Sequence, residues 1–139
     1  MNFREFVDNK IEIYHFSDID QDEMVVDPKY FGQNYFTKND TKIPIPRSFF
    51  YTNPQDSEVF FKNKPLYKAV IDKDKIYDLS EDKLEYREKN RNNGVLDFFE
   101  LLKNISKDYI GVSYRIHSGT MTVVSLFVPI LAHRVRERV

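Results

Sequence analysis

The chain has 139 residues and nearly balanced charge: 21 Lys and Arg stand against 22 Asp and Glu, for a formal net charge of -1. That balance excludes a protein drawn as a whole to nucleic acid or to an anionic membrane. The absence of cysteine excludes disulfides, thiol nucleophiles and thiolate metal sites.

Length and apolar content predict one folded domain over residues 1–139. Hydrophobic residues make up 41% and aromatic residues 15%, which is enough for a core in a chain of this length. The longest apolar run, residues 121–132, is far below the ~20 residues needed to cross a bilayer, and the first residues do not resemble a signal peptide. We therefore expect a cytoplasmic protein with no membrane partner, and nucleic acid is not indicated.

The first half predicts two strands separated by a long loop. Residues 2–9 have the amphipathic spacing of a short helix, and residues 11–17 alternate around β-branched and aromatic side chains, as a strand does. Residues 18–46 contain several prolines, a glycine and Asn-Asp, and predict a loop of a length that is often functional. Residues 47–52 predict a second strand, and residues 54–62 a helical turn.

The second half predicts two further strands, two helices and a final pair of strands. The expected ranges are strands 66–71 and 75–79, helices 80–91 and 94–105, and strands 109–116 and 121–130. The last run is almost entirely apolar, which is typical of a central strand buried on both faces. Strands at both ends with helices between them indicate the α+β class.

Several common chemistries are not indicated. The four glycines are isolated, so no phosphate-binding loop is predicted, and the three histidines lack metal-ligand spacing. Asp18, Asp20 and Asp22 alternate, but the glycine and closing glutamate of a calcium loop are missing. No metal site is predicted.

Two features single out residues for a functional role. His15 interrupts an apolar strand and is followed by Ser17, and Arg47 precedes the aromatic run Phe49-Phe50-Tyr51. Each has an ordinary structural explanation as well, a half-buried histidine and the packing of an aromatic strand.

Together with neighbouring motifs, these features resemble a known family. The motifs are Tyr14-His15-Phe16-Ser17, Asp27-Pro28-Lys29-Tyr30-Phe31-Gly32, Tyr35-Phe36-Thr37, Pro46-Arg47-Ser48-Phe49-Phe50-Tyr51, Tyr109-Ile110-Gly111-Val112 and Phe127-Val128-Pro129-Ile130. Over residues 11–130 the chain resembles small ADP-ribosyltransferase-like domains of phages and mobile elements, which are often modules of polyvalent proteins. The resemblance implies split, bent small β-sheets with flanking helices and a cleft for NAD.

The resemblance also implies cofactor contacts for five residues. His15 would hydrogen-bond an adenosine ribose hydroxyl, with Phe16 and Ser17 beside the nicotinamide amide. Tyr51 would stack on the nicotinamide ring, and Arg47 would contact the pyrophosphate. These roles require the rings of His15 and Tyr51 to face each other across one cavity.

Catalysis in such a family needs a carboxylate near the oxocarbenium-like ribose. The late strand expected at residues 121–130 carries no acid, which leaves Glu58 as the catalytic candidate. The alternative is that Glu58 is an ordinary solvated residue of a turn. Two functions therefore stay open. One is an NAD-dependent mono-ADP-ribosyltransferase that modifies a host macromolecule, and the other is a catalytically inactive relative that binds a host or phage protein. The setting would be the host cytoplasm or, for a phage-encoded protein, the virion.

Overall fold

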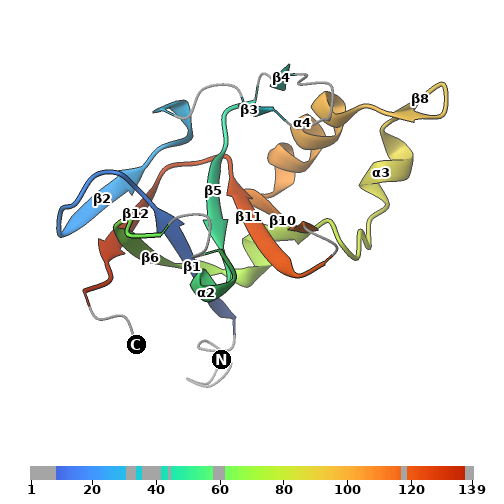
Figure 1. Ribbon diagram of the computed structural model, residues 1–139. Coiled ribbons are helices and arrows are strands. Elements are labelled where there is room, and N and C mark those ends of the chain that lie inside the picture. Colours follow the sequence, from blue (N-terminus) through green and yellow to red (C-terminus); the bar gives the residue numbers. More distant parts are fainter. Residues whose placement is uncertain are drawn as a thin grey trace.

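The computed structural model describes residues 9–30, 34–35, 42–43, 45–57, 62–116 and 119–136, and the helix expected to start at residue 2 falls outside these ranges. The described chain is sheet-rich with short helices, which confirms the α+β class (Figure 1). The main sheet contains β1 (Lys10–Phe16), β2 (Glu23–Val26), β5 (Ser48–Tyr51), β6 (Leu66–Asp72), β7 (Ile76–Asp78), β10 (Gly111–Ile116), β11 (Met121–Leu126) and β12 (Ile130–Arg134). Their order is β2-β12-β6-β1-β5-β11-β10-β7, and only the β7–β10 pair is parallel.

Smaller elements connect these strands. Two short pairs are β3 (Asn34–Tyr35) with β4 (Lys42–Ile43) and β8 (Arg91–Asn92) with β9 (Val95–Leu96). The helices are α2 (Pro54–Ser57), α3 (Tyr86–Lys89) and α4 (Phe98–Asp108), and the 3-10 turns are η1 (Pro28–Tyr30) and η2 (Lys73–Lys75).

The main sheet consists of two halves that meet at one residue pair. We call β2, β12, β6 and β1 the β1 half, and β5, β11, β10 and β7 the β11 half. β1 pairs with β6 along its whole length, from Lys10↔Asp72 to Phe16↔Leu66, but with β5 only at Tyr14↔Tyr51. The structure thus differs from the expected pair of separate sheets, because all eight strands form one sheet. The β1–β5 pairing that connects the two halves consists of a single residue pair.

One hydrophobic core joins the two halves on a shared face. Val26 of β2 and Val124 of β11 belong to the same buried cluster, although four strands lie between them in the sheet order. The sheet is therefore bent around this cluster. Ile13 lies in it, and because side chains alternate along a strand, His15 points to the same face.

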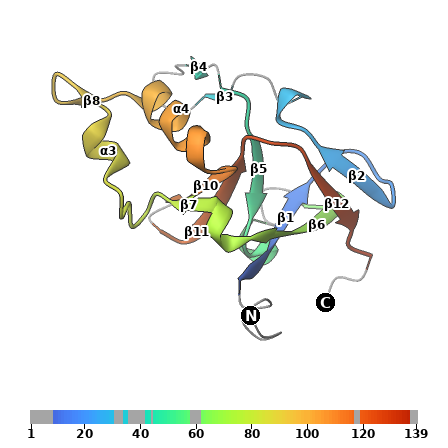
Figure 2. The ribbon, with the colours of Figure 1, turned by 180° about the vertical axis from the view of Figure 1, so that it is seen from behind.

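The other face of the β11 half is covered by α4 (Figure 2). Leu101, Leu102 and Ile105 recur at helical spacing, are fully buried, and pack against Tyr77, Leu79 and Val112. The helix begins at Phe98 because the Asp97 side chain accepts a hydrogen bond from the Glu100 amide at 3.1 Å.

The two expected helices of the second half are both shorter than predicted. The helix expected from residue 80 begins only at Tyr86, because Asp82 and Glu85 have left-handed backbone angles, with φ of 49° and 57°. The helix expected from residue 94 begins at Phe98. Asn93 and Gly94, both with positive φ, instead form the turn of the β8–β9 hairpin.

Two further expectations are corrected. The predicted loop of residues 18–46 contains β2, η1 and the β3–β4 pair. The predicted strand of residues 121–130 is two strands: β11 ends at Leu126, and after Pro129 the chain continues as β12, which pairs with β2 and β6. β11 itself lies between β5 and β10 and is buried on both faces, which confirms its central position.

Candidate functional site

A cavity of about 500 Å³ lies at the carboxyl end of β1, which is within the range of roughly 300–1,000 Å³ typical of small-molecule sites. Three consecutive residues at the end of this strand, His15, Phe16 and Ser17, line it. The remaining wall comes from the following loop, from β2 and the turn after it, and from the segment before β6: Asp18, Ile19, Gln21, Met24, Val25, Val26, Asp27, Tyr30 and Lys64. The cavity thus combines apolar surface with a few polar groups.

His15 is only 6% exposed and is held in one orientation. Its Nδ1 lies 2.8 Å from the Phe49 carbonyl oxygen, and its ring packs against Phe50 at a centroid distance of 5.2 Å. A carbonyl only accepts, so Nδ1 donates, and in the neutral ring Nε2 is the acceptor. Burial lowers the pKa of His15, although the Phe49 carbonyl opposes the effect. The imidazole is therefore neutral at pH 7.

The His15 hydrogen bond also connects the two halves of the sheet. His15 belongs to β1 and Phe49 to β5, and the bond lies one residue beyond the Tyr14↔Tyr51 pair. The side chain thus bridges the two strands where their backbone pairing ends.

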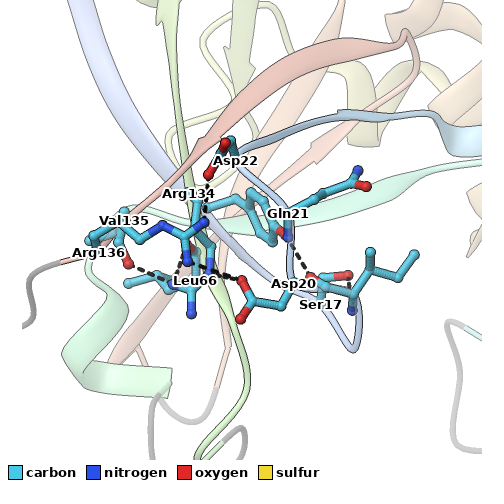
Figure 3. A network of polar contacts seen from close by, with 10 residues as sticks. Ser17, Asp20, Gln21, Asp22, Leu66, Arg134, Val135 and Arg136 are labelled. Carbon is cyan, nitrogen blue, oxygen red and sulfur yellow. Dashed lines mark hydrogen bonds and ion pairs between the residues drawn. The ribbon is translucent and has the colours of Figure 1, made fainter.

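The loop of residues 17–22 forms one cavity wall and is braced along its length (Figure 3). The Tyr67 hydroxyl donates to the Ile19 carbonyl at 2.6 Å and accepts from the Gln21 amide at 2.9 Å. Ser17 makes two further bonds: its amide donates to the Pro65 carbonyl at 3.0 Å, and its hydroxyl accepts from the Ile19 amide at 3.1 Å. The wall is therefore largely preorganised.

The same loop is tied to the last strand by a group of four charged residues, which we call the Arg–Asp clamp. Arg134 contacts Asp20 at 2.8 Å, and Arg136 contacts Asp22 at 2.7 Å and Asp20 at 3.4 Å (Figure 3). The backbone amide of Arg134 also donates to the Asp22 carbonyl at 2.9 Å. The clamp links residues more than one hundred positions apart in the chain.

Charged groups of the cavity wall are paired. Lys64 forms an ion pair with Asp18, whose side chain is 84% exposed. Asp27 is the more buried carboxylate, with 18% of its side chain exposed, and lies 3.6 Å from Lys29 Nζ.

Tyr51 does not share this cavity with His15. The register Tyr14↔Tyr51 puts Tyr51 on the same face as Tyr14, and strand alternation turns His15 to the opposite face. Accordingly the Tyr51 ring lies 6.4 Å from the Phe16 ring, whereas His15 contacts Phe50. The expectation that the rings of residues 15 and 51 face each other across one hollow is wrong in this structure.

Arg47 also lies away from the cavity and is completely buried. Its guanidinium carbon is 5.9 Å from the centre of the Phe49 ring, and burial lowers its pKa while nearby Tyr114 opposes that shift. Tyr114 in turn is hydrogen-bonded to Ser125 of β11 at 3.0 Å. Arg47 therefore belongs to a polar and aromatic group within the β11 half.

Glu58, the catalytic candidate, lies outside the described residues. No residue of β11 is acidic, and its buried Ser125 is engaged by Tyr114. Across the described ranges, no group of three or more His, Cys, Asp or Glu side chains is placed to hold a metal ion. Within the same ranges, no helix has both the length and the apolarity needed to cross a bilayer.

Sequence reasoning identified the strand end of the cavity but missed its other walls. The motif that contains Asp27 and Tyr30 assigns them no role, and the sequence-based expectations include neither Lys64, in the wall, nor Tyr67, which braces the loop behind it. The signal for Tyr67 is its place on the apolar face of a strand, in register with Ala69 and Ile71, because a buried tyrosine hydroxyl needs a partner.

Comparisons with known proteins find no matching family model, no matching curated protein and no matching solved structure.

Proposed function

We propose that this chain is an ADP-ribosyltransferase-like domain that binds NAD or a related nucleotide in the cavity at the end of β1, and that it acts through binding. One observation carries the proposal. His15, Phe16 and Ser17, to which the resemblance assigns cofactor contacts, line a single cavity of about 500 Å³. The proposal gives up the stacking role of Tyr51, because its ring lies on the opposite face from His15, so the nucleotide would be held without the pair of facing rings that the resemblance implies.

The groups in the wall suit the parts of a nucleotide. The neutral His15 ring offers an acceptor to a ribose hydroxyl, and the Asp27 carboxylate offers another. Tyr30, 78% exposed, supplies an aromatic face for a base, and Lys64 supplies a positive charge for a phosphate.

The connection between the sheet halves also supports the family. A split sheet with the nucleotide at the division is what the resemblance implies, and here the halves meet at the one pair Tyr14↔Tyr51, next to His15.

Nucleotide binding is favoured over ADP-ribose transfer, because transfer requires a carboxylate near the ribose and β11, the strand expected to supply it, has none. β11 carries no carboxylate, and Tyr51 and Arg47 do not line the cavity. Nicotinamide departure leaves a cationic ribose centre, which strongly depends on a nearby negative charge. The domain would then serve as a nucleotide-dependent binding module for a host or phage protein.

A second candidate is the mono-ADP-ribosyltransferase itself. Asp27 favours it, because this cavity carboxylate is mostly buried and could supply the anion. Glu58 remains the other candidate acid.

The binding proposal is tested by calorimetric titration of NAD into the wild type, His15→Asn and Tyr51→Phe. Asparagine places its amide nitrogen near the position of Nδ1 and preserves the bond to Phe49, but it removes Nε2. We expect His15→Asn to weaken NAD binding about tenfold, the equivalent of about one hydrogen bond, and Tyr51→Phe to leave it unchanged. A folded wild type that does not bind NAD at millimolar concentration would refute the proposal.

The second candidate is tested by incubation with labelled NAD and cell extract. We expect NAD binding without transfer of label to protein. Label transfer that disappears in Asp27→Asn or Glu58→Gln would instead establish the transferase and identify its acid.

A further inference from the structure

A second cavity, of about 370 Å³, lies beside β10 in the β11 half. β7 pairs with the first three residues of β10, and from Tyr114 onward no described strand pairs with this edge of β10. The cavity occupies this position, near the start of α4. Its walls include Phe49, Leu79, Arg87, Phe98, Tyr114 and Arg115, none of which lines the His15 cavity.

The wall combines aromatic rings with cationic groups, and none of its described residues carries a carboxylate. Phe49, Phe98 and Tyr114 provide three rings from three different elements, and Arg87 and Arg115 provide two guanidinium groups. Arginine binds phosphate through paired N–H donors, and aromatic faces stack on planar ligands.

The two arginines are placed differently. Arg87 Nη1 donates to the Leu79 carbonyl at 2.5 Å, which fixes its guanidinium in the wall. Arg115 is exposed, and its side chain makes no hydrogen bond or ion pair with any other described residue. One cation is thus preorganised, and the other is able to turn toward a ligand.

Further charges near the cavity are compatible with an anion. The buried guanidinium of Arg47 lies 5.9 Å from the Phe49 ring, behind the wall. Two acids on adjoining segments are engaged by backbone amides: Asp82 accepts from the amides of Tyr86 and Arg87, and Asp97 caps α4.

We propose that this cavity binds a small aromatic phosphate, with the ring against Phe49, Phe98 and Tyr114 and the phosphate on Arg87 and Arg115. The site is separate from the His15 cavity and does not depend on the function proposed for it. The domain would then hold two ligands, one in each half of the sheet.

Phenyl phosphate is the probe, titrated into the isotopically labelled protein and followed by NMR. We expect saturable shifts at Phe49 and Tyr114, with binding weakened about tenfold or more in Arg115→Gln, because the change removes a charge-assisted hydrogen bond to the phosphate. Arg91→Gln is the matched control, since Arg91 is also exposed but lies in the β8–β9 hairpin and pairs with Glu88. It should bind like the wild type.

Two comparisons complete the test. Phenol and inorganic phosphate should each bind at least about tenfold more weakly than phenyl phosphate, because each lacks one of the two groups recognised. His15→Asn should leave the affinity unchanged. Equal binding by the wild type and Arg115→Gln, equal binding of inorganic phosphate, or shifts centred on Ser17 would overturn the proposal.

Discussion

The two halves of the sheet are stabilised in different ways. The β11 half is packed on both faces, by the shared core on one side and by Leu101, Leu102 and Ile105 of α4 on the other. On the outer face of the β1 half, Val25, Val70 and Leu131 are all about half exposed, at 57%, 54% and 47%, and no described helix covers them.

In the β1 half, where no described helix packs on the outer face, polar contacts provide support. Tyr67 and the Arg–Asp clamp hold residues 17–22 against β6 and β12. Regions with little apolar burial open more readily than packed ones, so we expect local opening to start in the β1 half. The His15 cavity lies in this more easily opened half. A ligand bound there should therefore stabilise the folded state of this half against local opening.

The largest effect should follow from removing a buried side chain of α4. Leu102→Ala leaves a void in a fully buried position and should lower the free energy of unfolding by about 2–5 kcal/mol. Chemical denaturation measures the loss. The control is Leu84→Ala, at a position 48% exposed, which should change stability by less than about 0.5 kcal/mol. A loss below about 1 kcal/mol in Leu102→Ala would show that α4 is not part of the cooperative unit.

Tyr67→Phe tests the polar support of the β1 half. The change removes the hydroxyl that serves both the Ile19 carbonyl and the Gln21 amide, and unpaired buried groups cost about 1–3 kcal/mol. We expect a smaller loss of stability than in Leu102→Ala, together with weaker NAD binding, because the cavity wall is loosened.

Tyr86→Phe is the control for the loss of a hydroxyl, since its bond to Asp108 is long, at 3.3 Å, and exposed. If Tyr67→Phe and Tyr86→Phe behave alike, the bracing of residues 17–22 does not depend on Tyr67.

Elements with strong local periodicity could be predicted from the sequence. The strand around His15, the strand before Asn53 and the buried stripe of α4 were all expected, and the structure confirms them. His15, Phe16 and Ser17, at and just after the end of β1, were also named, because the family resemblance assigns cofactor contacts to them, and the structure places all three in one cavity wall. The Asn93-Gly94 hairpin was predictable too, since this dipeptide favours a two-residue turn, but the helical pattern that follows obscured it.

The rest depends on pairings between distant segments. The face on which Tyr51 lies follows from its register with Tyr14, and a register is not encoded by either strand alone. The same holds for β12, which begins directly after Pro129 and pairs with β2 and β6 instead of extending β11. Lys64, Asp27 and Tyr30 reach the cavity only because these strands are brought together.

The stability that the His15–Phe49 hydrogen bond gives to the connection between the two halves should depend on pH. Because burial lowers the pKa of His15, the unfolded chain takes up the proton first. The contribution of the neutral ring is complete above the ordinary histidine pKa of about 6.5 and is lost as pH falls from there through the lower folded pKa. Unfolding free energies measured between pH 7.5 and 5 should fall more steeply in the wild type than in His15→Asn. Parallel curves would show that the imidazole is not desolvated.

We expect the smallest effect from the Arg–Asp clamp, because three of its four charged side chains, Asp20, Asp22 and Arg136, are more than half exposed to water. The hydrogen bond from Arg134 holds the pKa of Asp20 below its usual range, so the contribution of this carboxylate is complete above about pH 3.9 and is lost as pH falls through the lower folded pKa.

At neutral pH, Asp20→Asn should leave global stability nearly unchanged but accelerate amide hydrogen exchange at residues 18–22. High salt should produce the same acceleration in the wild type, because ions screen exposed pairs. Glu81→Gln, which breaks the exposed pair with Lys83 in the β11 half, should leave this exchange unaltered. Exchange at residues 18–22 that is insensitive to both Asp20→Asn and salt would mean that the uncharged contacts, those of Tyr67 and Ser17 among them, hold the wall without the clamp, and the two halves would then differ in packing but not in electrostatics.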